Sequence, residues 1–90
     1  MEIIWDPAKA KANLKKHGVH FSDAETIFFD TLALTTEDID AEGESRFVTI
    51  GQDSTSRILV VVYTYRDEDI RLISARTAIR NEIKVYENGI

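Results

Sequence analysis

The sequence contains no cysteine, only one proline and only four glycines among its 90 residues. The absence of cysteine excludes disulfides and thiolate metal sites, and it is consistent with a cytoplasmic protein. The longest uninterrupted aliphatic run, residues 58–62, is far too short to span a membrane. The opening MEIIWDP lacks the basic and then apolar pattern of a secretory signal peptide. We therefore expect a cytoplasmic protein that has no contact with a membrane.

Basic residues are outnumbered by acidic ones, 11 to 16, which gives a net charge of −5. Taken alone, this balance argues against binding to nucleic acid, because phosphate contacts need clustered lysines and arginines. The basic residues are, however, clustered. Four lysines and no acidic residue lie between Lys9 and His17, and the segment 70–84 carries four basic residues and one acidic residue. Two basic surfaces can therefore exist on an acidic chain.

Two N-terminal helices are predicted from the signals at their ends. Asp6-Pro7 suits the N-cap and first position of a helix that runs to His17, and Gly18 suits the left-handed residue that follows. The pattern S-x-x-E at 22–25 is typical of a capping box and predicts a second helix to about Phe29.

The rest of the chain predicts a sheet and a third helix. A polar, acidic loop is expected at 37–45 and a hairpin loop at 66–69, whereas apolar spacing predicts a helix over 77–87. The strands are expected at residues 2–5, 31–35, 46–51, 57–65 and 70–75. The predicted fold class is α+β, as a single domain over residues 1–90. An antiparallel meander sheet is packed by two N-terminal helices and one C-terminal helix.

No pattern in the sequence is typical of a metal or cofactor site. His17 and His20 lie three residues apart but straddle a predicted helix end, and there is no H-E-x-x-H motif and no glycine-rich phosphate loop. We therefore predict no metal ion and no cofactor. What remains is a set of cationic and acid–base side chains: Lys16, His17, Arg66, Arg71, Arg76, Arg80, Glu82 and Tyr86.

These side chains also have ordinary structural interpretations. Basic residues at the end of the first helix complement the negative end of its dipole, and Arg66 would be a solvated loop residue. Arg76 and Glu82 would form an ion pair, Tyr86 would pack in the core, and Ser74 would be structural. The functional interpretation places a phosphate at Arg76, ahead of a helix N-terminus, where a guanidinium fork and backbone N–H groups can both bind it.

Several longer stretches are more specific together than apart. They are Trp5-Asp6, NLKKHGVHF at 13–21, DAETIFFD at 23–30, ESRFVTIG at 44–51, LVVVYT at 59–64 and IRLISARTA at 70–78. Glu82 and Tyr86 then complete the pattern S-A-R-x-A-x-x-x-E-x-x-x-Y. In this order and spacing, the sequence resembles the BrnT family of bacterial toxins from type II toxin–antitoxin pairs, and the resemblance covers nearly the whole chain.

The resemblance implies a RelE-like fold and a metal-independent endoribonuclease that inhibits translation. It also implies a BrnA-type antitoxin, a ribbon-helix-helix protein that binds operator DNA, neutralises the toxin and represses the shared operon. Operator DNA would then be contacted only through the antitoxin. In such toxins the 2′-OH of RNA attacks the neighbouring phosphorus, so the site must move protons and stabilise a crowded phosphorane.

We assign site residues on this basis. The expected arrangement brings Lys16 and His17 together with Arg66 and Arg76 across the sheet, around the scissile phosphate. The proposed catalytic residues are His17, Arg66, Arg76, Glu82 and Tyr86, and the proposed RNA-binding residues are Lys16, Arg71 and Arg80.

Two functions with the same fold and partner remain open. One is the ribonuclease toxin; the other is a catalytically weak binding module that mainly forms an autorepressing complex with its antitoxin. Cations that converge without acidic partners would favour the first, and dispersed cations paired with acids would favour the second. A small domain unrelated to toxins is a third alternative.

Overall fold

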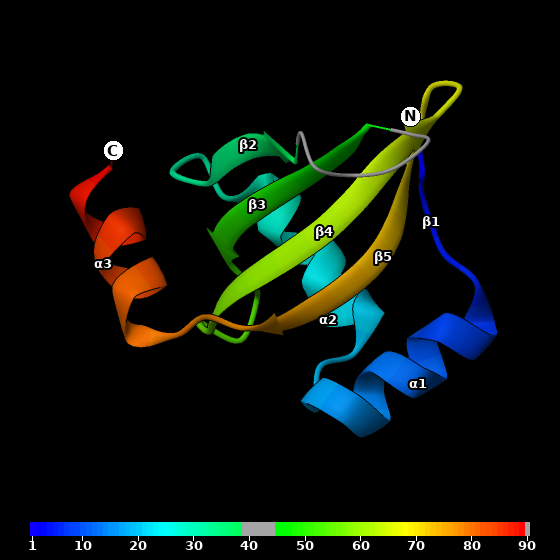
Figure 1. Ribbon diagram of the computed structural model, residues 1–90, viewed down its shortest axis with the longest axis horizontal. Helices are drawn as coiled ribbons and strands as arrows, with labels where there is room; N and C mark the ends of the chain where they lie inside the picture. Colours follow the sequence, from blue (N-terminus) through cyan, green and yellow to red (C-terminus); the bar gives the residue numbers. More distant parts are fainter. Residues whose placement is uncertain (39–44, 90) are drawn as a thin grey trace.

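The computed structural model of the chain describes residues 1–38 and 45–89. Its strands form one sheet in the order β1-β5-β4-β3-β2, in which β2 to β5 make an antiparallel meander and β1 pairs parallel to β5 (Figure 1). The elements are β1 (Ile3–Ile4), α1 (Pro7–His17), α2 (Phe21–Ala24), the 3-10 helix η1 (Glu25–Phe29), β2 (Leu34–Asp38), β3 (Arg46–Gln52), β4 (Ile58–Arg66), β5 (Asp69–Thr77) and α3 (Arg80–Asn88). The predicted α+β class is confirmed, with a parallel strand added at one edge.

The hydrophobic core lies between the sheet and the N-terminal helices. Phe21 and Ile27 from the helical segment pack with Leu59 and Leu72 from the central strands, and all four are at most 2 % exposed. Burying side chains of this size stabilises the fold by roughly 1.5–3 kcal/mol each. Figure 1 shows α1 and α2 on one side of the sheet and α3 beyond its far end. Within the described residues, no helix is both long and apolar enough to cross a membrane.

The first helix forms as its end signals predict. A carboxylate oxygen of Asp6 accepts a hydrogen bond from the backbone N–H of Ala8 at 2.8 Å, and Pro7 occupies the first turn. Gly18 has a φ of 70° and donates its N–H to the carbonyl of Leu14. These contacts satisfy backbone groups that a helix end would otherwise leave without partners.

The predicted capping box of the second helix is wrong. The helix begins at Phe21, one residue before Ser22, with His20 as its N-cap and no side-chain hydrogen bond at the cap. Ser22 is exposed, whereas Phe21 and Ala24 are buried. Burial of the two apolar residues fixes the helix start, because it outweighs a cap contact worth about 1 kcal/mol.

Strand β2 lies three residues later than predicted. A carboxylate oxygen of Asp30 accepts the N–H of Leu32 at 2.9 Å, which holds residues 31–32 in a turn rather than a strand. Glu37 and Asp38, expected in the acidic loop, are instead the last residues of β2. The remainder of that predicted loop, residues 39–44, lies outside the described residues.

The β4–β5 hairpin is longer than predicted. Arg66 pairs with Asp69, so that only residues 67–68 form the turn, and Asp67 has a left-handed φ of 56°. Strand β5 extends to Thr77, because the N–H of Ala78 still donates to the carbonyl of Ile58 on β4. The last helix therefore starts at residue 80 rather than 77.

Candidate functional site

The side chain of Asn13 joins α1 to the edge of β5. Its Nδ2 donates to the carbonyls of Ala75 and Val19 at 2.9 and 3.0 Å, and its Oδ1 accepts the N–H of Ala75 at 3.0 Å. Strand β1 pairs with β5 only at Ile70 and Arg71, so the amide takes the place of a neighbouring strand farther along β5. The arrangement fixes the distance between α1 and β5.

A groove of about 220 Å³ lies along this junction. It is lined by Lys9, Ala12, Asn13, Lys16, His17, Ile73 and Ser74. None of the ion pairs formed within residues 1–38 and 45–89 involves the two lysines or the histidine of the groove. Cationic side chains that gather in a cavity without acidic partners are typical of an anion site. The α1–β5 groove can therefore take a phosphate.

Arg76 lies two residues beyond Ser74 on β5 and is not among the described residues that line the groove. By the register of β5, Ser74 and Arg76 project from the face turned away from the core, and their Cα atoms are about 7 Å apart. Both guanidinium Nη atoms of Arg76 donate to the two carboxylate oxygens of Glu82 at 2.8 Å. This hydrogen bonding raises the pKa of Arg76 although burial opposes it, so the arginine stays charged beside the groove.

Glu82 has two structural roles at once. Besides the guanidinium of Arg76, its Oε1 accepts the N–H of Ile79 at 2.9 Å, which caps α3. The hydrogen bond from Arg76 holds the pKa of Glu82 below its ordinary value, against the effect of burial and with help from the N–H of Ile79. None of the nine residues of α3, all of them described, is buried. Polar contacts rather than core packing therefore position this helix.

The second polar anchor of α3 is Tyr86. Its hydroxyl donates to Oδ2 of Asp30 at 2.5 Å, and this bond, with burial, raises the pKa of Tyr86 to about 12. Burial raises the pKa of Asp30, but hydrogen bonds from Tyr86 and from the N–H groups of Gln52 and Leu32 outweigh it, so the net shift is downward. Tyr86 is half-buried and does not join the core cluster. The alternative of core packing is thus wrong for this residue.

The structure does not bring all the predicted cations together. Arg76 pairs in register with Val60, whereas Arg66 lies six residues farther along β4, a separation of about 20 Å. Arg71 stands opposite Thr64, about 13 Å from Arg76 along the sheet. The predicted meeting of Arg66 with Arg76 is therefore wrong, because the short turn makes Arg66 the last residue of a long strand. Arg80 is the exposed first residue of α3.

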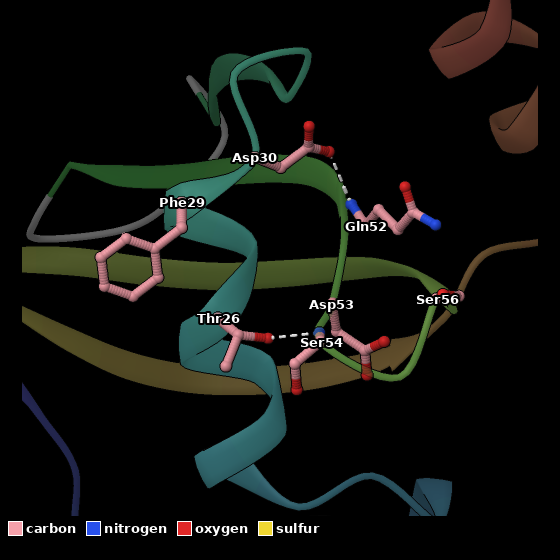
Figure 2. Close-up of a pocket in the computed structure, with 7 residues that line it drawn as sticks. All are labelled: Thr26, Phe29, Asp30, Gln52, Asp53, Ser54 and Ser56. Atoms are coloured by element: carbon pink, nitrogen blue, oxygen red, sulfur yellow. Dashed lines mark hydrogen bonds between the residues drawn. The ribbon is translucent and has the colours of Figure 1, made fainter.

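A larger cavity of about 470 Å³ opens between η1 and the β3–β4 turn (Figure 2). Asp30 and Asp53 are its charged lining residues, and the carboxylate of Asp53 is already bonded to Thr55 and Arg57. Phe29, 83 % exposed, points away from the polar lining residues in Figure 2. Two carboxylates repel a phosphate, so the smaller α1–β5 groove is the better candidate for an anion.

Sequence reasoning did not assign Lys9, Asn13 or Ser74 to the site. Lys9, Asn13 and Lys16 are spaced i, i+4 and i+7, which places them on one face of a helix. This spacing is the feature of the sequence that could have identified Lys9 and Asn13. For Ser74 the sequence favours a structural role, whereas the structure places it in the groove wall. A serine on a strand gives no signal of its own, since only the docking of α1 brings it beside the cations.

The chain is similar to known proteins over most of its length. Residues 5–82 match the family model described as the ribonuclease toxin, BrnT, of type II toxin–antitoxin systems. The crystal structure of the Brucella abortus ribonuclease toxin BrnT, solved at 1.1 Å, is similar, with a TM-score of 0.68 and 29 % sequence identity over 89 % of this chain and 99 % of that chain. No curated protein matches the sequence. The chain therefore belongs to the BrnT family of ribonuclease toxins of type II toxin–antitoxin systems.

Proposed function

We propose that this chain is a metal-independent endoribonuclease that acts in the cytoplasm and inhibits translation by cutting RNA. The observation behind the proposal is the α1–β5 groove, which Lys16 and His17 line together with Ser74. Arg76 follows two residues later on the same face of β5. A phosphate beside Ser74 would then meet cations from the helix and from the strand. Membership of a ribonuclease family selects RNA as the source of that phosphate.

The reaction needs two proton transfers and stabilisation of charge. The 2′-OH of one nucleotide loses its proton and attacks the adjacent phosphorus, the P–O5′ bond breaks, and the departing 5′ oxygen gains a proton. The products are a 2′,3′-cyclic phosphate and a 5′-hydroxyl. We assign both transfers to His17, because imidazole can accept the proton of the 2′-OH and then donate a proton to the departing 5′ oxygen. Lys16 and Arg76 stabilise the negative charge of the phosphorane.

The remaining predicted residues act at a distance from the reacting phosphate. Glu82 orients the guanidinium of Arg76, since both of its carboxylate oxygens accept hydrogen bonds from it. Tyr86 keeps α3 in place through Asp30. Arg66 and Arg71 lie farther along the sheet, and we assign them, with Arg80, to phosphates on either side of the cleaved bond.

The partner in this proposal is a BrnA-type antitoxin with a ribbon-helix-helix DNA-binding domain. The family is defined by type II toxin–antitoxin pairs, so a protein antitoxin belongs to the system. We propose that the antitoxin covers the α1–β5 groove and Arg76, because this blocks RNA directly, and that operator DNA is bound only by the antitoxin. Amide hydrogen exchange of the complex tests this, since residues 9–17 and 73–76 must become protected. An antitoxin that leaves both segments unprotected contradicts the assignment.

A second candidate is a binding module with little catalytic activity. It is favoured by the two short hydrogen bonds between Arg76 and Glu82 and by the position of Arg66 about 20 Å away. Expression of the chain alone in a bacterial host, followed by the rate of protein synthesis, separates the two. The ribonuclease proposal predicts a prompt fall for wild type and none for Arg76→Ala. Soluble, folded wild-type protein that leaves synthesis unchanged supports the binding module.

A further inference from the structure

The groove extends beyond the residues assigned to the reaction. Lys9 and Lys16 are seven residues apart on α1, which places their Cα atoms about 10 Å apart along the helix and within about 20° of the same side. Both line the cavity, with Asn13 between them. Only Lys16 adjoins His17 in sequence, so Lys9 lies about two helical turns away from the proposed proton carrier.

Both lysines belong to the wall of the groove that α1 forms. Asn13 lines the groove and makes three hydrogen bonds to Ala75 and Val19, and none of the described residues that line the groove is acidic. In a stacked strand, phosphates advance about 3.4 Å per nucleotide along the axis. A spacing of about 10 Å therefore matches phosphates about three nucleotides apart, or closer in an extended strand.

We propose that the α1–β5 groove holds a second phosphate of the same RNA strand at Lys9, on the side of the reacting phosphate away from Arg76. This inference rests on the proposed function for the identity of the ligand as RNA. It adds a requirement for substrate length: a dinucleotide occupies only the site beside Ser74, whereas a longer strand also reaches Lys9. The lysine contacts the backbone, so the second site adds affinity without preference for a base.

Binding of 2′-O-methyl oligonucleotides tests the proposal, because the blocked 2′ oxygen prevents cleavage. End-labelled strands of two and six nucleotides are titrated with wild type, Lys9→Gln and Lys11→Gln, and fluorescence anisotropy is followed between 50 and 200 mM salt. Lys11 is the matched control, since it is an exposed lysine of the same helix outside the groove. Circular dichroism establishes that all three proteins are folded.

The expected result is specific to length and position. Lys9→Gln lowers the affinity for the hexanucleotide by about threefold or more. It also reduces the slope of log affinity against log salt concentration by about 0.7, the value for one phosphate contact to a single strand. The affinity of Lys9→Gln for the dinucleotide equals that of wild type, and Lys11→Gln binds both strands as wild type does. The inference is overturned if Lys9→Gln and Lys11→Gln lose the same affinity, or if Lys9→Gln loses the same affinity for both oligonucleotides. It is also overturned if wild type does not bind the hexanucleotide.

Cleavage of the matching unmodified hexanucleotide separates this inference from the proposed function. If Lys9 affects binding as expected but no product appears, the ribonuclease proposal fails and the second phosphate site stands. If wild type cleaves the strand and Lys9→Gln has no effect on its binding, the second site fails and the ribonuclease proposal stands.

Discussion

The side-chain amide of Asn13 bonds both the N–H and the carbonyl of Ala75, 62 residues away in the sequence. An asparagine thus completes the edge of β5 where no strand does, and in doing so it sets the width of the α1–β5 groove. Lys9, Lys16 and His17 lie on the same helix as Asn13, so this contact helps to place them beside Ser74.

Asn13→Ala is expected to destabilise the protein by about 2–4 kcal/mol. The substitution removes three hydrogen bonds and leaves the buried N–H and carbonyl of Ala75 without a partner, and each buried group of this kind costs about 1–3 kcal/mol. Urea denaturation measures the change, with Ala12→Ser as a control on the same helix. A loss below about 0.5 kcal/mol would show that the amide does not hold α1 to β5.

Glu82→Gln should remove part of the acid sensitivity of the fold. The folded-state pKa of Glu82 is lowered from its ordinary value of 4.5, so its stabilising effect is present above pH 4.5 and is lost as pH falls through the folded pKa. The partner Arg76 is 41 % exposed, so solvent screening limits the effect to about 1 kcal/mol or less. Unfolding free energies at pH 3 to 7 test this, beside the exposed Glu87→Gln. Identical pH profiles for wild type and Glu82→Gln would contradict it.

Tyr86→Phe should change how the stability of the fold depends on alkaline pH. The pKa of Tyr86 is raised from 10.0 to about 12, so the contact with Asp30 stabilises the protein below pH 10 and is lost as pH rises from about 10 to 12. The phenylalanine variant should be less stable than wild type by about 1 kcal/mol at pH 7, and this difference should shrink above pH 10. Thermal unfolding across this range measures it. A difference that is the same at pH 7 and pH 12 would rule out the hydrogen bond as its cause.

Much of the fold is predictable from local signals, and the errors have physical causes. Helix α1 follows from Asp6-Pro7 and Gly18, which act through contacts with their own neighbours. The second helix does not follow from Ser22, because burial of Phe21 sets its start. Likewise β2 is displaced by the turn at Asp30, whose carboxylate also binds Tyr86 from the far end of the chain. A contact across 56 residues has no local signal.

The candidate site was predictable in part for the same reason. Lys16 and His17 at a helix end and Arg76 with Glu82 are visible as short patterns, and the structure places each pair together. The position of Arg66 was not predictable, because it depends on the register of β4 against β5 and on the length of the turn between them.

Arg76→Gln and Arg66→Gln are expected to differ strongly in activity. Arg76 lies beside the groove, and loss of one preorganised cation at a developing charge costs about 10²–10³ in rate. Arg66 lies about 20 Å away, so its loss should weaken RNA binding by only about threefold and leave the rate at saturation unchanged. Single-turnover cleavage of a labelled RNA measures both. Equal losses of rate would show that the two arginines act on the same phosphate.

Cleavage of RNA by the purified chain in the presence of EDTA, comparing His17→Gln with His20→Gln, is the decisive experiment for a metal-independent ribonuclease. His20 is the matched control, an exposed histidine three residues away that does not line the groove. Wild type and His20→Gln are expected to produce 2′,3′-cyclic phosphate and 5′-hydroxyl ends, and His17→Gln is expected to cleave more slowly by a factor of about 10²–10⁴. Cleavage that stops with EDTA, or that is equally fast in both variants, would contradict it.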